Sequence, residues 1–212
     1  MLQAYPTKSG TGITILGDYG DLASLYSTVQ HVADTLKESN RYQKGQFQLL
    51  MNFCYEIRKA YSGQRDKEKI TFDSGDEHSY YAFRVVWTDI LIFISVLRHN
   101  AGYAQSDKFN QACMYLVEYF VEKALFEYDP EGANIIKEFI AQRINIRDQY
   151  AFLIYQAVHI KFVTEKPGKT ANDNQLVNGF DGHTQAARKS RRKGVHHTQP
   201  GVQKEPGQGH DA

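Results

Sequence analysis

The chain has few of the residues that cross-link a fold or anchor a protein in a membrane. Its 212 residues include two Cys, five Pro and one Trp. Two cysteines cannot supply a disulfide framework or a four-cysteine zinc site, and Cys54 and Cys113 both lie among apolar neighbours, where a free thiol behaves as a small apolar side chain. The longest apolar run, residues 90–97, is far shorter than the roughly 20 residues that span a bilayer. We therefore expect no disulfide-rich fold and no membrane partner.

Positive and negative charges are also nearly balanced. Lys and Arg number 25 against 24 Asp and Glu, a net charge of +1, so the whole chain has no electrostatic preference for nucleic acid or for an acidic membrane. The first residues lack the basic patch, the apolar core and the small-residue cleavage site of a secretory signal. These features predict a cytoplasmic protein in a reducing compartment.

Large apolar residues become rare after Thr164. Burial that sparse cannot offset the roughly 1 to 2 kcal/mol that ordering the backbone costs per residue. We therefore predict a single folded domain over residues 1–164 and a disordered tail over 165–212. The tail carries eight basic and five acidic residues, so it is mildly basic.

Hydrophobic periodicity predicts six helices and two hairpins in the folded part. Helices are expected over 18–38, 44–62, 88–99, 106–128, 130–143 and 145–163, and hairpins over 2–17 and 68–86. A lone hairpin is marginal in water, so the two hairpins should join in one small antiparallel sheet. The predicted fold class is α+β and mostly helical. The expected helix-end residues are Asp18 or Asp21, Gly63, Thr88, Ser106, Pro130 and Asn145.

Two groups of polar residues are candidates for a ligand pocket. Asp18, Tyr19 and Asp21 lie in a glycine-flanked acidic turn between a strand and a helix. Arg84, Trp87 and Arg98 bracket the most apolar helix, where Arg98 would serve as an anion anchor because its guanidinium presents a fixed fork of donors. Each group also has a purely structural interpretation, since an aspartate caps a helix start and an arginine suits a helix end.

The opening of the chain supplies a resemblance. Residues 7–26, TKSGTGITILGDYGDLASLY, resemble the N-terminal signature of a family of uncharacterised bacterial proteins, a domain of unknown function. The resemblance extends loosely to about residue 160. It implies a bacterial cytosolic protein and no particular activity, so it assigns no functional residue.

The tail contains a compact basic run. Arg188, Lys189, Arg191, Arg192 and Lys193 place five positive charges within six residues, which suits non-specific phosphate contacts with nucleic acid. The alternative is a solubilising tail, because no folded nucleic-acid module accompanies the run.

The sequence holds no recognisable catalytic or metal-binding constellation. H-E-x-x-H and G-x-S-x-G motifs are both missing, and we expect no metal and no cofactor. The leading hypothesis is a non-enzymatic protein-binding or assembly module that presents a Tyr-bearing face to a partner or to a second copy, since 14 of the residues are Tyr. A nucleic-acid-associated protein that uses the basic tail is the second hypothesis. The third is an enzyme with an atypical pocket.

Overall fold

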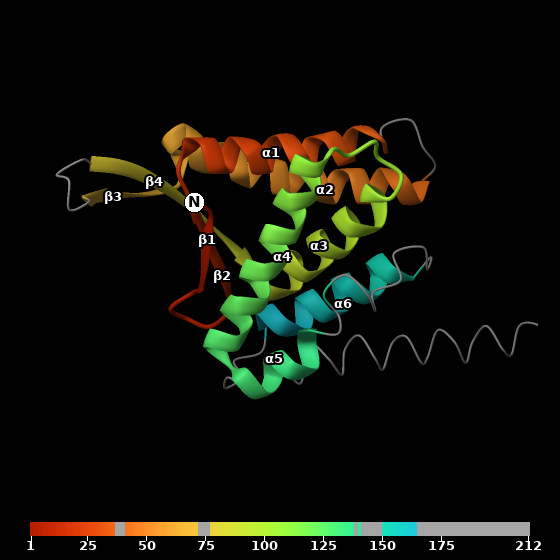
Figure 1. Cartoon of the computed structure of the whole chain (residues 1–212). Helices are drawn as coiled ribbons and strands as arrows, with labels where there is room; N and C mark the ends of the chain where they lie inside the picture. The colour runs from red at the N-terminus through yellow and green to blue at the C-terminus, as the bar shows by residue number, and fades with distance from the viewer. Residues whose placement is uncertain (37–40, 72–76, 138–139, 141–149, 165–212) are drawn as a thin grey trace, which may run out of the picture.

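The computed structural model describes residues 1–36, 41–71, 77–137, 140 and 150–164. Within them lie four strands and six helices (Figure 1), which confirms the predicted mostly helical α+β class. The elements follow in the order β1 (Gln3–Pro6), β2 (Gly12–Gly17), α1 (Tyr19–Asp34), α2 (Arg41–Lys59), the π-helical turn η1 (Ala60–Gln64), β3 (Asp66–Thr71), β4 (Glu77–Val86), α3 (Trp87–Ala101), α4 (Lys108–Tyr128), α5 (Pro130–Ile136) and α6 (Ala151–Thr164).

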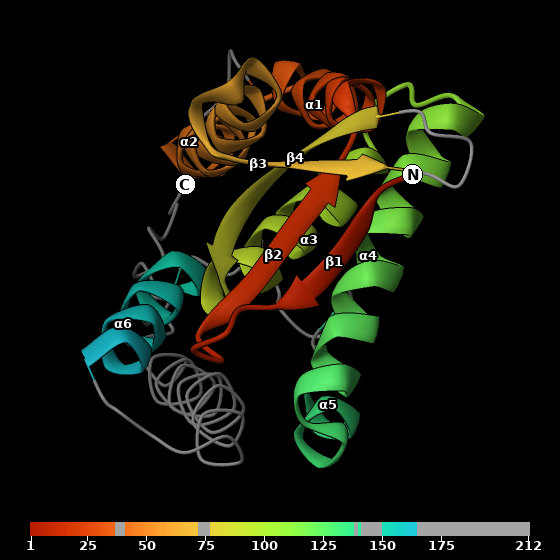
Figure 2. The ribbon, with the colours of Figure 1, turned by 90° about the vertical axis from the view of Figure 1, so that its left-hand side faces the viewer.

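The four strands form one antiparallel sheet in the order β1-β2-β4-β3 (Figure 2). The two hairpins join through β2 and β4, where Gly12 pairs with Val86 and Gly17 with Tyr81. This confirms that the hairpins share a sheet. β3 pairs with β4 only as far as Ala82, opposite Asp66. In the described part of the chain, residues 83–86 of β4 thus have a neighbouring strand on one side only.

Helices cover one face of this sheet, and α4 runs along its β1 edge (Figure 2). Alternation along a strand sends Ile13 and Ile15 of β2 and Phe83 and Val85 of β4 into the main core. Leu16 of β2 instead joins a separate small cluster with Tyr80 and Ala82. The main core therefore lies between the sheet and α1, α2, α3 and α4.

The predicted helix-end residues Asp18 and Gly63 are confirmed. The carboxylate of Asp18 accepts a hydrogen bond from the backbone N–H of Asp21 at 2.8 Å, and the carboxylate of Asp21 accepts one from the N–H of Asp18 at 3.1 Å, a reciprocal capping box at the start of α1. Gly63 has a φ of 76°, the left-handed conformation that ends helices and that glycine adopts without strain.

The predicted caps Thr88 and Ser106 are wrong, whereas Pro130 is confirmed in the first turn of α5. Thr88 lies inside the first turn of α3, which begins at Trp87 after Val86, and its hydroxyl contacts His159 instead of a backbone N–H. Asp107, not Ser106, caps α4 by accepting a 2.7 Å hydrogen bond from the N–H of Asn110. The Pro130 helix begins as predicted but ends at Ile136, short of residue 143. The expected cap Asn145 and the tail from 165 onward lie outside the described residues.

Candidate functional site

The acidic turn of the sequence prediction is a helix start. Asp18 and Asp21 direct their carboxylates at each other's backbone N–H groups, so both serve the capping box of α1. Tyr19 is exposed, and its ring meets the ring of Tyr61 edge to face with centroids 5.4 Å apart. The arrangement of all three residues follows from how α1 begins and packs.

Trp87 and Arg98 occupy two further, separate places on α3. Trp87 is fully buried and donates a 3.1 Å hydrogen bond from its Nε1 to the carbonyl oxygen of Gly10. Arg98 donates from its Nε to Glu118 on α4 at 2.8 Å and adds a second hydrogen bond to the other carboxylate oxygen. Its guanidinium also lies 4.4 Å from the centre of the Tyr115 ring. Both side chains thus fasten α3 to its neighbours.

The sequence predicts six candidate pocket residues in two groups, and Arg84 alone among them lines the cavity that lies between α2, β4, α3 and α6. This cavity has a volume of about 420 Å³. Its lining includes residues 84–86, in the part of β4 that has no second neighbouring strand among the described residues. The lining residues are Leu49, Asn52, Tyr55, Glu56, Arg84, Val85, Val86, Asp89, Phe93 and Tyr155.

Asp89 places a carboxylate in this cavity. The Tyr155 hydroxyl donates a 2.6 Å hydrogen bond to its Oδ1, and His159 Nδ1 lies 3.0 Å from the same oxygen. His159 Nδ1 is also 2.8 Å from the Thr88 hydroxyl. Burial, then the hydrogen bond and the charge of Asp89, raises the pKa of Tyr155, so the phenol stays a proton donor at neutral pH.

No sequence pattern indicated this cluster. Asp89 is recognisable at the start of a helix, where it complements the helix dipole. Tyr155 and His159, however, lie about 70 residues further along the chain on α6. Only the packing of α6 against α3 brings these side chains to Asp89.

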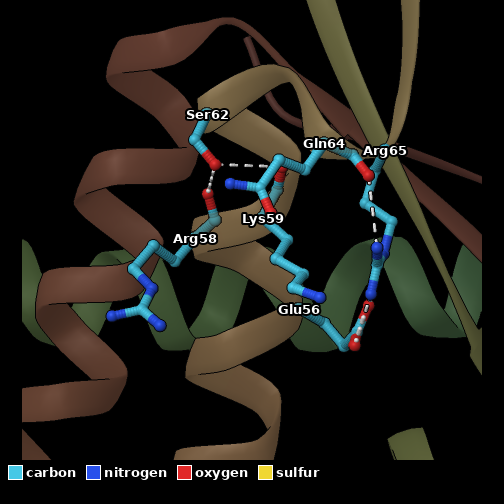
Figure 3. A network of polar contacts seen from close by, with 6 residues as sticks. All are labelled: Glu56, Arg58, Lys59, Ser62, Gln64 and Arg65. Atoms are coloured by element: carbon cyan, nitrogen blue, oxygen red, sulfur yellow. Dashed lines mark hydrogen bonds and ion pairs between the residues drawn. The ribbon is translucent and has the colours of Figure 1, made fainter.

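The two other charged residues of the lining, Glu56 and Arg84, have ion-pair partners, and Figure 3 shows Glu56 with Arg65. Arg65 donates two hydrogen bonds to the carboxylate of Glu56, at 2.8 and 2.9 Å. Arg84 donates one hydrogen bond, from its Nη2 to the carboxylate of Asp66 on β3, at 2.6 Å. Lys59 lies outside the lining, with its ammonium 4.4 Å from the centre of the Tyr55 ring. Glu56 and Arg84 are therefore both charge-compensated.

A second feature lies on the outer face of α4. Tyr115, Tyr119 and Phe126 are 56%, 58% and 39% exposed, and with the exposed Glu122 they fall at spacings of four, three and four residues, which places them along one side of a helix. We call these four residues the α4 stripe. The opposite side of α4 is buried in the core through Val117, Val121 and other side chains. The helix thus has apolar side chains on two faces, and only one of these faces is buried in the core.

The described residues contain no group of three His, Cys, Asp or Glu side chains placed to hold a metal ion. Across those same segments, every helix is too short or too polar to cross a membrane. The basic run of Arg188, Lys189, Arg191, Arg192 and Lys193 lies outside the described residues, so its contact with nucleic acid stays a prediction.

Comparison with known proteins places the chain in a family. The model of the family described as Domain of unknown function (DUF6904) matches residues 2–176, so the chain belongs to that family. The match confirms membership of a domain-of-unknown-function family, the resemblance expected from the opening residues, and it reaches beyond Thr164. No curated protein and no solved structure matches the chain.

Proposed function

We propose that this member of the family is an assembly module that pairs with a second copy of itself through the α4 stripe. The observation that carries the proposal is the exposure of Tyr115, Tyr119 and Phe126 along one side of a helix whose other side is already buried. Aromatic side chains are enriched at protein interfaces, and apolar patches on a surface mark interaction sites.

The chemistry of the stripe favours an antiparallel pair of helices. Its spacing is symmetric about the midpoint between residues 120 and 121, so an antiparallel copy sets Tyr115 against Phe126 and Tyr119 against Glu122. The first pairing stacks two aromatic rings, and the second lets a phenol donate to a carboxylate. Such a two-fold contact is the commonest way in which identical chains associate.

Charges beside the stripe support the same orientation. Burial and then the like charge of Glu118 raise the pKa of Glu122, against a smaller lowering by Lys137. In the antiparallel pair, Glu122 faces Tyr119 of the second copy, so no further carboxylate is set directly against it. A parallel pair would set Glu122 against Glu122, which adds repulsion instead.

Arg98 holds part of the stripe in place before any association. Its guanidinium is fixed by two hydrogen bonds to Glu118 and lies over the Tyr115 ring. A side chain that is already ordered loses less conformational freedom on binding. Tyr115 is therefore a suitable anchor for the contact.

Sedimentation velocity over a wide range of protein concentration tests the proposal. The wild-type chain should pass from monomer to dimer, and the double variant Tyr119→Ser, Phe126→Ser should stay monomeric. Phe109→Ser is the matched control, because Phe109 is 61% exposed on the same helix but points about 120° away from the stripe. A monomeric wild-type chain, or dimers equally weakened by the control, would contradict the proposal.

The expected setting remains the bacterial cytosol. Two free, buried cysteines support a reducing compartment, since neither is bonded to the other. Growth of the chain's natural host and recovery of the protein from its cytosolic or periplasmic fraction would decide this point.

A further inference from the structure

The cavity between α2, β4, α3 and α6 holds one carboxylate, that of Asp89, with which no Lys or Arg of the described segments pairs. Of its three charged lining residues, Glu56 is paired with Arg65 and Arg84 with Asp66. The partners of Asp89 are a phenol and an imidazole, and the imidazole carries charge only when protonated. Among the described residues, no Lys or Arg side chain forms an ion pair with Asp89.

One oxygen of this carboxylate is open to a ligand. Tyr155 and His159 both contact Oδ1 of Asp89, and within the described segments Oδ2 has no hydrogen-bond partner. A carboxylate oxygen accepts strong hydrogen bonds from charged donors. The free oxygen is thus suited to an N–H group that carries positive charge.

Three aromatic rings line the same cavity, those of Tyr55, Phe93 and Tyr155. Aromatic faces attract cations, and rings combined with a carboxylate are a recurrent way to hold organic ammonium groups. Tyr55 already accepts the ammonium of Lys59 near its ring. Apolar contacts from Leu49, Val85 and Val86 complete a surface for a hydrocarbon body.

We propose that this cavity binds a small organic ammonium ion: an amine with an apolar body, whose nitrogen donates to Asp89 while its hydrocarbon part lies among the three rings. The proposal goes beyond self-association and does not depend on it, because no residue of the α4 stripe lines the cavity. Tyr155 and His159 act as positioning residues that fix the orientation of the Asp89 carboxylate.

Three probes of one shape and different charge test the proposal. Benzylammonium, benzyl alcohol and benzoate share a ring and differ in the group attached to it. Each is titrated into the full-length protein at pH 7 while the backbone amide NMR signals of Asp89, Phe93 and Tyr155 are followed. We expect benzylammonium to bind with a Kd at least about tenfold lower than either other probe, which corresponds to one charge-assisted contact.

A pair of charge-matched variants assigns the binding to the cavity. Asp89→Asn should raise the Kd of benzylammonium about tenfold or more, whereas Glu77→Gln should leave it unchanged, because Glu77 pairs with Lys69 on the strands and does not line the cavity. Equal binding of the three probes, shifts confined to other regions, no shifts with any probe, or full binding by Asp89→Asn would overturn the proposal. If Asp89→Asn fails to fold, the comparison of the three probes on the wild-type protein still decides.

Discussion

The Nε1 of Trp87 donates a 3.1 Å hydrogen bond to the carbonyl oxygen of Gly10, 77 residues earlier in the chain. This contact ties the β1–β2 turn to the first residue of α3. The ring of Tyr128, at the end of α4, lies against Trp87 with centroids 6.2 Å apart. The buried indole thus connects α3, which carries Asp89, with α4, which carries the α4 stripe.

Gly10 should tolerate substitution less well than Gly63. Both have positive φ, 71° and 76°, so alanine at either position is strained by about 1 to 2 kcal/mol. A Cβ on Gly10 would also lie 2.5 Å from the Tyr128 hydroxyl, whereas a Cβ on Gly63 meets nothing within 4 Å. We expect Gly10→Ala to cost about 1 to 3 kcal/mol more than Gly63→Ala in urea unfolding. Equal losses would mean that Tyr128 moves aside freely.

Arg98 and Arg84 should differ in their contribution to stability. The Arg98 pair with Glu118 is largely shielded, with side chains 34% and 12% exposed, whereas the Arg84 pair with Asp66 is 68% and 54% exposed. Arg98→Met leaves the Glu118 carboxylate without its cation and should cost about 1.5 to 3 kcal/mol. Arg84→Met should cost about 0 to 1 kcal/mol. Chemical denaturation of the two variants side by side measures the difference, and a larger loss for Arg84→Met would refute this assignment.

The two cysteines should be inert in the folded protein. Burial, with a smaller contribution from Asp34 and an opposing one from Arg58, raises the pKa of Cys54 to about 12. Burial likewise raises the pKa of Cys113. Because the thiolate is the reactive form, both should resist a thiol reagent at pH 8 and react once urea unfolds the chain. Mass spectrometry after brief labelling gives the readout, and rapid labelling of the native protein would contradict the buried positions.

Asp18 should contribute to the stability of the fold and not to binding. Asp18→Ala removes one half of the capping box of α1 and should cost about 0.5 to 2 kcal/mol, as should Asp107→Ala, which removes the cap of α4. The same Asp18 variant should keep the dimerisation of the wild-type chain. If Asp18→Ala has the same free energy of unfolding as the wild-type chain but abolishes self-association or probe binding, the acidic turn is a functional site instead.

Local patterns predicted most elements of the fold. The short β-branched arm of residues 13–16, the apolar face of α1 and the glycine at 63 each depend on neighbours in the sequence, and the structure places all three as expected. Ser106 failed because the adjacent Asp107 is an equally good cap, and sequence alone does not choose between neighbouring caps.

The cavity depends on information that no local pattern holds. Asp89 meets Tyr155 and His159 only because α6 packs against α3, and the open end of β4 exists because β3 stops pairing at Ala82. The Tyr content led to the hypothesis of a Tyr-bearing binding face, which stays a prediction, and it did not indicate where exposed Tyr side chains would lie. Identifying Tyr115 and Tyr119 as exposed required knowing which side of α4 enters the core.

Disulfide trapping tests the antiparallel α4 contact most directly. Chains carrying Tyr115→Cys are mixed with chains carrying Phe126→Cys and oxidised mildly, and the buried native cysteines do not compete. We predict a cross-linked dimer in the mixture, with far less in either variant alone or in a mixture of Phe109→Cys with Phe126→Cys. Efficient cross-linking of Tyr115→Cys with itself, or none above the Phe109 control, would contradict pairing through the α4 stripe.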